Sequence, residues 1–337
     1  MMKQYVLKRF FLLLPTFLGI TGLTFFMLQL APGDPAALKA QSFTELLADP
    51  QQTEAVVTET QKLYGLEKPL SLQYLLWLKR IVLFDFGESY RDHRPVMAKI
   101  AEALPITLLL NALTLLVIFV IAFPLGAYNA LKPNSFHDRV SALFLFLLYS
   151  LPSFWFALLL IVLFAGGDYL NLFPLIGIFS DGAERLPWYG RIGNLLWHLI
   201  LPVIVLSVAN IAFLSRFVRA SLVEVMKKEY IRTAYAKGLS PFQVMVKHAF
   251  KNALLPLVTL FGSLLPALLS GSVIVEQIFS IPGMGRLSFE SVLARDYPVI
   301  MGITVMTATL MLISYFVTDI VYGFLDPRLR LHERRGL

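Results

Sequence analysis

Long apolar runs separated by polar segments make up most of this chain. Each run approaches or exceeds the roughly 20 apolar residues with which a helix crosses a bilayer. The runs lie at about 10–30, 104–131, 140–166, 197–219, 253–279 and 299–325. The pattern therefore predicts an all-α fold, that of a polytopic membrane protein with six transmembrane helices.

The polar segments predict how the chain is divided. Residues 31–103 hold too many charges for a bilayer and too few apolar runs for a large domain, which indicates a small extramembrane subdomain. Within it, residues 70–87 predict an amphipathic helix on the membrane or on the helix bundle. We expect a tail and first span at 1–30, a transmembrane core at 104–325 with a polar loop at 220–252, and a tail at 326–337.

Composition and the first apolar run support the membrane interpretation. The 337 residues are 57% hydrophobic and 15% charged, against about 45–50% and about 25% in soluble domains. The first run exceeds the about 7–15 residues of a signal-peptide core, which favours a retained span. The absence of Cys excludes disulfide bonds, a thiol nucleophile and Cys-ligated metal sites.

The placement of charge predicts the orientation. Seventeen Lys and Arg residues and five acidic residues fall in the N-terminus, residues 131–139, residues 216–251 and the C-terminal tail. The opposite set of segments carries 12 basic and 16 acidic residues. Because basic loops stay inside, both termini and the 220–252 loop are predicted to face the cytoplasm. The net charge of +7 is explained in this way, and we expect no nucleic-acid partner.

The polar loop has a pattern of its own, "EYIRTAYAKGLSPFQVMVKHAFKNALLP" at 229–256. An apolar stripe at i, i+4 spacing predicts a helix up to Gly238, where glycine suits the left-handed cap of a helix end. The stripe is formed by Leu222, Met226, Tyr230 and Ala234.

A second helix is predicted to start at once. Ser240 is a candidate N-cap, Pro241 suits the first helical position and Gln243 completes a capping box, with Leu239 and Val244 at hydrophobic-staple positions. Two interpretations fit this stiff corner. It is an ordinary positive-inside loop, or a helix that fills a groove in a partner.

Other candidate chemistry is sparse. No phosphate-binding loop of the G-x-x-x-x-G-K-[ST] type occurs, so energy must come from another chain or from a gradient. The five His residues are scattered, so we expect no metal site, and no catalytic residues can be grouped. The glycine-rich "IPGMGRL" at 281–287 is interpreted as a tight turn near an outer gate.

Four residues are candidates for a pathway or an outer gate. Asp319 lies inside the sixth apolar run, where burying an acidic side chain costs free energy. Three interpretations fit it: pairing with a basic residue, a place on the substrate pathway, or proton coupling. Pro266 and Gly271 in the fifth run fit a pathway-lining helix or plain helix packing. Glu276, at the outer end of that run, is a candidate for gate or receptor contact, or a solvated helix terminus.

Several motifs along almost the whole chain resemble one family. They are "APGDP" at 31–35, "YGLEKP" at 64–69, "EYIRTAYAKG", "HAFKNALLP", "EQIFSIPGMGRL" at 276–287, "RDYPV" at 295–299 and "DPRLR" at 326–330. The chain resembles the inner-membrane permeases of ABC importers, in the dipeptide, oligopeptide and nickel branch. Pieces of residues 164–205 further resemble the subgroup that imports oligopeptides and peptide antibiotics of the microcin C type.

The resemblance implies a type I permease fold and a coupling helix around residues 229–245 that docks into an ATP-hydrolysing subunit. The wider family motif begins Glu-Ala-Ala, whereas the equivalent run here begins at Arg232. The residues implied in coupling are Glu229, Tyr230, Arg232, Thr233, Ala234, Ala236, Lys237, Gly238, Ser240 and Pro241.

The resemblance also implies partners and a location. We expect a second permease chain, two ATPase subunits that bind ATP and Mg, and an extracytoplasmic substrate-binding protein, in the bacterial inner membrane. This chain then holds no cofactor and is no enzyme. It imports peptides or, in the same family, nickel chelates. The rival class is a gradient-driven secondary transporter, which usually shows inverted repeats and several intramembrane charges. A membrane-embedded enzyme is the third class of protein to consider.

Overall fold

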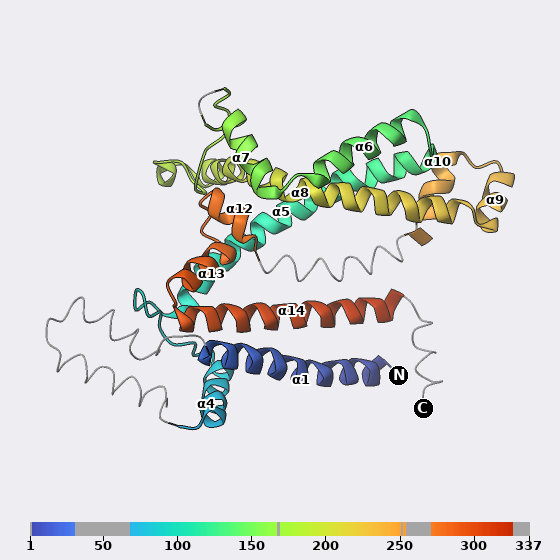
Figure 1. The fold of residues 1–337 in the computed structure, drawn as a ribbon. Helices are drawn as coiled ribbons and strands as arrows, with labels where there is room; N and C mark the ends of the chain where they lie inside the picture. The colour runs from blue at the N-terminus through green and yellow to red at the C-terminus, as the bar shows by residue number, and fades with distance from the viewer. Residues whose placement is uncertain (1, 31–67, 167–168, 251, 254–270, 326–337) are drawn as a thin grey trace, which may run out of the picture.

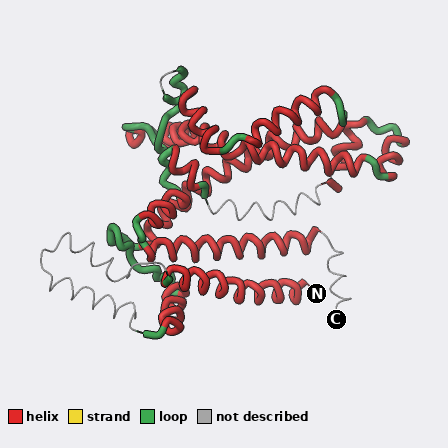
Figure 2. Tube along the Cα trace, in the orientation of Figure 1, coloured by secondary structure: helices red, strands yellow, loops and turns green. Residues whose placement is uncertain are grey.

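The computed structural model describes residues 2–30, 68–166, 169–250, 252–253 and 271–325, and these form helices joined by loops (Figures 1 and 2). Four of the helices have apolar segments long enough to cross a membrane. They are α1 Met2–Gln29, α5 Val96–Leu131, α8 Trp188–Met226 and α14 Tyr297–Leu325.

The third predicted span is broken. The helices α6 Phe136–Ser150 and α7 Ser153–Phe164 are long and apolar enough to cross a membrane only as a pair, and they are bent by 98° at Leu151 and Pro152. Leu151 is extended, as the residue before a proline prefers, and Pro152 has no N–H to continue the helix. The span predicted over 140–166 is therefore formed by two helices with a sharp bend between them.

The count of six spans stays a prediction. Four helices, or five spans with the bent pair, are long and apolar enough within the described part of the chain. Most of the fifth apolar run, including 254–270, lies outside the described residues.

Shorter elements complete the described chain. They are α4 Leu70–Val82, a 3-10 turn at Ala183–Arg185, α9 Glu229–Ala236, α10 Pro241–Val244, a π-helical turn at Met245–Ala249, α12 Val273–Ile278 and α13 Met284–Leu293. The amphipathic helix predicted near 70–87 is present as α4. It lies on the bundle, because Tyr74 and Trp77 pack against Phe25 of α1 and the Tyr74 hydroxyl lies 2.9 Å from that of Thr21.

Close approach of α5 and α8 forms the centre of the fold, and the two helices lie side by side in Figure 1. Gly126 makes this possible, because a Cβ there would lie 2.5 Å from the carbonyl oxygen of Ser215 and 2.8 Å from Cβ of Val218. Apolar side chains of both helices fill the core on either side of this contact.

The molecule has two distinct ends (Figure 1). The first residues of α1, the last described residues of α14, the α5–α6 loop and the α9–α10 corner lie at one end, which we call the basic end. The helices α4 and α13 lie at the other, which we call the distal end. The described segments that the charge count groups together, namely the N-terminus, residues 131–139 and residues 216–250, are thus brought to one end by the fold.

Candidate functional site

The corner between α8 and α10 begins with a break in the helix. α8 ends at Met226, and Lys228, with φ −75° and ψ 150°, is the extended N-cap of α9. The sequence predicts one helix here with Tyr230 in its apolar stripe, and this is wrong. The break shifts the helical phase, so Ile231 is fully buried near Ala234, whereas Tyr230 is 43% exposed.

The predicted turn at Gly238 is confirmed. Gly238 has a φ of 80°, in the left-handed region that glycine adopts without strain, just after the end of α9. Ser240 Oγ accepts a bond from the Gln243 N–H at 3.3 Å, and Gln243 Oε1 accepts one from the Ser240 N–H at 3.1 Å. Pro241 opens α10, so the capping box forms as expected.

The buried face of the corner packs against the long helices α5 and α8. Ile231, Ala234 and Val244 are buried in one apolar cluster with Leu222 of α8 and Ala122 of α5. Leu239, the other staple residue, packs against the same cluster. Movement of the corner must therefore move α5 and α8 or open this core.

The second helix departs from the predicted α-helix. After α10, residues Met245–Ala249 form a π-helical turn, which is wider than an α-helical turn. Such turns are rare and frequently occur at functional sites. Met245 and Ala249 are buried in the cluster below the corner, whereas Lys247 and His248 are exposed.

The outer face of the corner is polar and open. Glu229 and Arg232 are highly exposed and form an ion pair at 2.9 Å. Arg232 stands where the wider family motif has Glu, and here a carboxylate lies one turn earlier on the same helix. Tyr235, Phe242 and the following predicted coupling residues are also exposed: Tyr230, Thr233, Ala236, Lys237, Gly238, Ser240 and Pro241. Ala234, predicted among them, is buried.

The basic end also holds a charge cluster that was not predicted from the sequence. The buried carboxylate of Asp138, in the first turn of α6, accepts hydrogen bonds from Arg219 and, at 3.1 Å, from Arg216, both on α8. It also accepts the Asn134 N–H at 2.9 Å, while Ser135 caps the helix. The only local signal was the Ser-x-x-Asp pattern of a helix start.

Glu276 is enclosed. Its side chain has no exposed surface, and it accepts bonds from the Thr107 hydroxyl at 3.1 Å, the Arg286 N–H at 2.9 Å and the Ser272 N–H at 3.3 Å. The interpretation as a solvated helix terminus is therefore wrong. The carboxylate joins α12, the start of α13 and α5 instead of facing a partner.

Three glycines make room for this carboxylate. A Cβ on Gly271, Gly283 or Gly285 would lie 2.5–3.0 Å from an oxygen of Glu276. Gly271, another predicted pathway residue, also has a φ of 68°, which favours glycine. The glycine-rich turn predicted near an outer gate thus encloses a buried carboxylate, and we call Glu276 with Gly271, Gly283 and Gly285 the cage. Pro266, the remaining predicted pathway residue of this run, lies outside the described residues.

Asp319 pairs with a basic residue, as one of its three interpretations expects. Its Oδ2 lies 3.3 Å from a guanidinium nitrogen of Arg9, and both side chains are partly exposed. The pair joins α1 and α14, which run side by side toward the basic end (Figure 1).

At the distal end, the loop that follows α4 is held by its own ion pairs. A hydrogen bond from Arg80 holds the pKa of Asp85 below its ordinary value. Burial alone would raise the pKa of Asp92, but hydrogen bonds with Lys99 and Ser89 hold it below its ordinary value. Both carboxylates therefore stay ionised to a lower pH than an unpaired Asp would.

Sequence comparison identifies the family. Residues 122–331 match the binding-protein-dependent transport system inner membrane component, and residues 2–111 match the N-terminal membrane component of such systems. The chain belongs to this family. The permease is 39% identical over 329 residues to the oligopeptide transport system permease protein AppB of Bacillus subtilis (strain 168), covering 97% of this chain and 99% of the relative.

Two further relatives are similar along their full length. The dipeptide transport system permease protein DppB of the same bacterium is 39% identical, covering 99% of the permease and 100% of the relative. The peptidoglycan transport system permease protein YejB of Agrobacterium fabrum (strain C58 / ATCC 33970) is 34% identical with the same coverage.

The predicted residues of the permease fall in three separate places. The coupling residues from Glu229 to Pro241 form one corner at the basic end, Asp319 lies on α14 with Arg9, and Gly271 and Glu276 lie together in the cage. The fold does not bring these places into one site.

Proposed function

We propose that this permease is the membrane-spanning subunit of an ATP-driven importer that carries peptides across the bacterial inner membrane. One observation carries the substrate class. Relatives that match almost the whole chain at 39% identity are permeases of oligopeptide and dipeptide transport systems.

The proposed partners include two ATP-hydrolysing subunits that bind ATP and Mg, since this chain has no phosphate-binding loop. One of them docks on the α9–α10 corner. Support comes from the contrast between its faces, because Ile231 and Val244 are fully buried while Glu229 and Arg232 project from the opposite side. An ion pair, exposed aromatic rings and a rigid turn are suited to a polar groove in another protein.

The corner is stiff enough to transmit movement. The capping box and the Gly238 turn fix the angle between α9 and α10, and the cluster around Leu222 joins the corner to α5 and α8. When the ATPase subunits close, the corner moves with them and tilts these long helices. Alternating exposure of the pathway to the two sides of the membrane follows from that tilt.

We further propose that the basic end faces the cytoplasm and the distal end faces outward. Support comes from the described basic segments, which lie together at one end, because the positive-inside rule favours the cytoplasmic side for such segments. The second permease chain completes the pathway beside this one, and an extracytoplasmic binding protein delivers the peptide to the distal end.

Uptake into reconstituted vesicles tests the proposal. The permease is assembled with its partner permease, ATPase subunits and binding protein, and uptake of labelled di- and oligopeptides is compared with uptake of nickel. We expect peptide uptake that requires both ATP and the binding protein. Uptake by this chain alone, driven by a proton gradient and indifferent to ATP, would overturn the proposal, and uptake of nickel without peptide would overturn the substrate class.

A further inference from the structure

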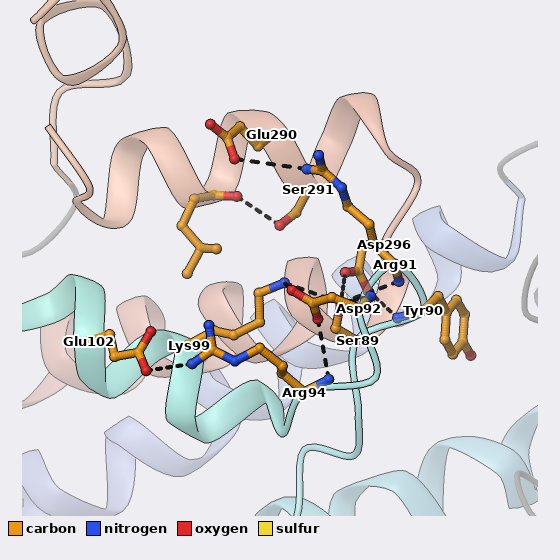
Figure 3. Close-up of polar contacts among 11 residues, drawn as sticks. Ser89, Tyr90, Arg91, Asp92, Arg94, Lys99, Glu102, Glu290, Ser291 and Asp296 are labelled. Atoms are coloured by element: carbon orange, nitrogen blue, oxygen red, sulfur yellow. Dashed lines mark hydrogen bonds and ion pairs between the residues drawn. The ribbon is translucent and has the colours of Figure 1, made fainter. Parts of the chain in front are cut away.

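Asp296 joins two segments that are far apart in the sequence (Figure 3). It lies between α13 and α14, and its carboxylate is 1% exposed. The hydroxyl of Ser89 donates to Oδ2, and the N–H of Tyr90 donates to Oδ1 at 3.0 Å. We call this contact the latch, and residues 83–95, between α4 and α5, the outer loop.

The outer loop is stiff where the latch holds it. Lys99 of α5 donates to Ser89 Oγ at 3.2 Å and to Asp92 at 2.8 Å, and a backbone bond joins the Ser89 N–H to the Arg94 carbonyl (Figure 3). A displacement of the loop surface therefore reaches Ser89 without being absorbed on the way.

On the other side of the latch, Asp296 is continuous with α14. The N-H of Ile300, in the first turn of α14, bonds to the Asp296 carbonyl at 3.0 Å. Just beyond, a Cβ on Gly302 would lie 2.6 Å from Val96 of α5, so the helices meet closely. The start of α14 thus moves with Asp296.

Backbone strain concentrates beside the latch. Phe84, His93 and Arg295 have φ values of 57°, 54° and 53°, in the left-handed region that side chains rarely adopt. They are three of the five such non-glycine residues in the described chain, and all lie in the two segments that the latch joins. Strain of this kind persists where surrounding contacts impose it, and it clusters at sites that switch.

The surface above the latch is charged and open. Arg91 is 63% exposed and lies 3.9 Å from Glu290 of α13, and Arg94 is half exposed and pairs with Glu102. These pairs span the outer loop, α5 and α13 (Figure 3). A soluble protein with a polar, charged surface is the kind of partner that such a face fits.

We propose that Asp296 is a positioning residue that passes contact between the binding protein and the outer loop to α14. The inference rests on the proposed function, because it takes the distal end as the side where the loaded binding protein arrives. Contact at Arg91 shifts the loop, the latch carries the shift to the start of α14, and the transmembrane core responds before ATP is hydrolysed.

The experiment compares ATP hydrolysis by the assembled, reconstituted importer with and without peptide-loaded binding protein. We expect Ser89→Ala to lower the ratio of stimulated to basal hydrolysis at least about fivefold, the lower range for coupling between two sites, with basal hydrolysis kept. Ser89→Thr keeps the hydroxyl and should keep the ratio. Ser150→Ala, which removes a hydroxyl that bonds to the Phe146 carbonyl within α6, far from the outer loop, is the matched control.

A misfolded variant loses basal and stimulated hydrolysis together, so the ratio separates positioning from plain stability. An unchanged ratio in Ser89→Ala, in an importer whose wild type responds to the binding protein, overturns the inference and leaves the proposed function standing. A wild-type importer that does not respond to the binding protein and imports no peptide contradicts the proposed function itself.

The absence of Cys from the chain allows a second measurement. Ser89→Cys combined with Asp296→Cys removes the hydrogen bond and permits a short thiol cross-link in its place. We expect a low ratio in the reduced importer and recovery after cross-linking. Failure of the two positions to cross-link contradicts the latch geometry, and cross-linking without recovery contradicts its role.

Discussion

Gly238 shows how one residue sets the direction of the corner. Its φ of 80° turns the chain from α9 into α10, and no atom lies within 4 Å of where a Cβ would stand. A side chain is therefore excluded by backbone conformation and not by crowding. A substitution at this position changes the angle of the corner without removing any packing contact.

We expect Gly238→Val to uncouple or disassemble the importer. A β-branched residue in the left-handed region costs about 1–2 kcal/mol, and the corner relieves that strain by changing its angle. Gly238→Asn is the matched control, because Asn tolerates this conformation. The measurements are co-purification of the ATPase subunits and ATP-dependent uptake. Normal uptake by the Val variant would show that the angle does not matter.

Glu276 makes a different contribution, as a buried acceptor for several donors. Removing it in Glu276→Ala leaves the Thr107 hydroxyl and the N–H groups of Ser272 and Arg286 without their acceptor. Each unsatisfied buried group costs about 1–3 kcal/mol, so we expect a loss of roughly 3 kcal/mol or more. Thermal unfolding of the purified importer measures it.

Two controls separate charge from packing in the cage. Thr107→Val has nearly the same shape, removes one donor to Glu276 and leaves the Met284 N–H without its acceptor. It thus leaves one buried donor unsatisfied where Glu276→Ala leaves three, so its effect should be smaller. Glu276→Gln keeps the shape but turns an amide donor toward backbone N–H groups, and should remain clearly destabilised. A Gln variant as stable as wild type would mean that the carboxylate is not required.

At the scale of elements, the helix pair α1 and α14 is joined near the basic end by the ion pair of Arg9 and Asp319. We expect Arg9→Gln or Asp319→Asn to loosen α1, because each leaves one charge without its partner in an apolar region. The exchange Arg9→Asp with Asp319→Arg should restore much of the loss. Thermal unfolding and protease sensitivity of α1 report the change. Equal loss in the exchanged variant and the single variants would exclude a direct pairing.

How far the sequence predicts these elements depends on whether their causes are local. The Gly238 turn and the Ser240 capping box are predicted correctly, because each depends on residues within a few positions. The phase of α9 is missed, since the two non-helical residues before it leave no clear signal and move Ile231 into the core. Pro152 itself indicated a possible bend, but a proline is equally compatible with one continuous helix that is only kinked.

Contacts between segments far apart in the chain could not be predicted from the sequence. The motif "EQIFSIPGMGRL" indicates a tight turn, yet the burial of Glu276 depends on Thr107, 169 residues earlier. Likewise, Asp296 belongs to a recognisable "RDYPV" motif, but its partners Ser89 and Tyr90 lie more than 200 residues away. Only the packing of α5 against α13 and α14 brings these groups together.

At the scale of the whole molecule, three apolar clusters lie one after another along α5. One lies below the corner, one lies among α5, α7, α8 and α12, and one joins the start of α5 to α13 and α14. Because α5 takes part in all three, a tilt imposed at the basic end is carried to the distal end. The cage and the latch lie beside the third cluster, where such a tilt would change the outer opening.

This arrangement requires that the two ends face opposite sides of the membrane, and the Cys-free chain permits a direct test. We expect Arg91→Cys, at the exposed outer loop, to react with an impermeant maleimide added to intact cells. Lys237→Cys, exposed on the corner, should react only in inside-out vesicles. Permease produced without the ATPase subunits should label fully at position 237, and co-assembly should protect it, because the corner is then covered. Labelling of both positions from the same side would contradict the orientation, whereas equal labelling with and without the ATPase subunits would contradict docking at the corner alone.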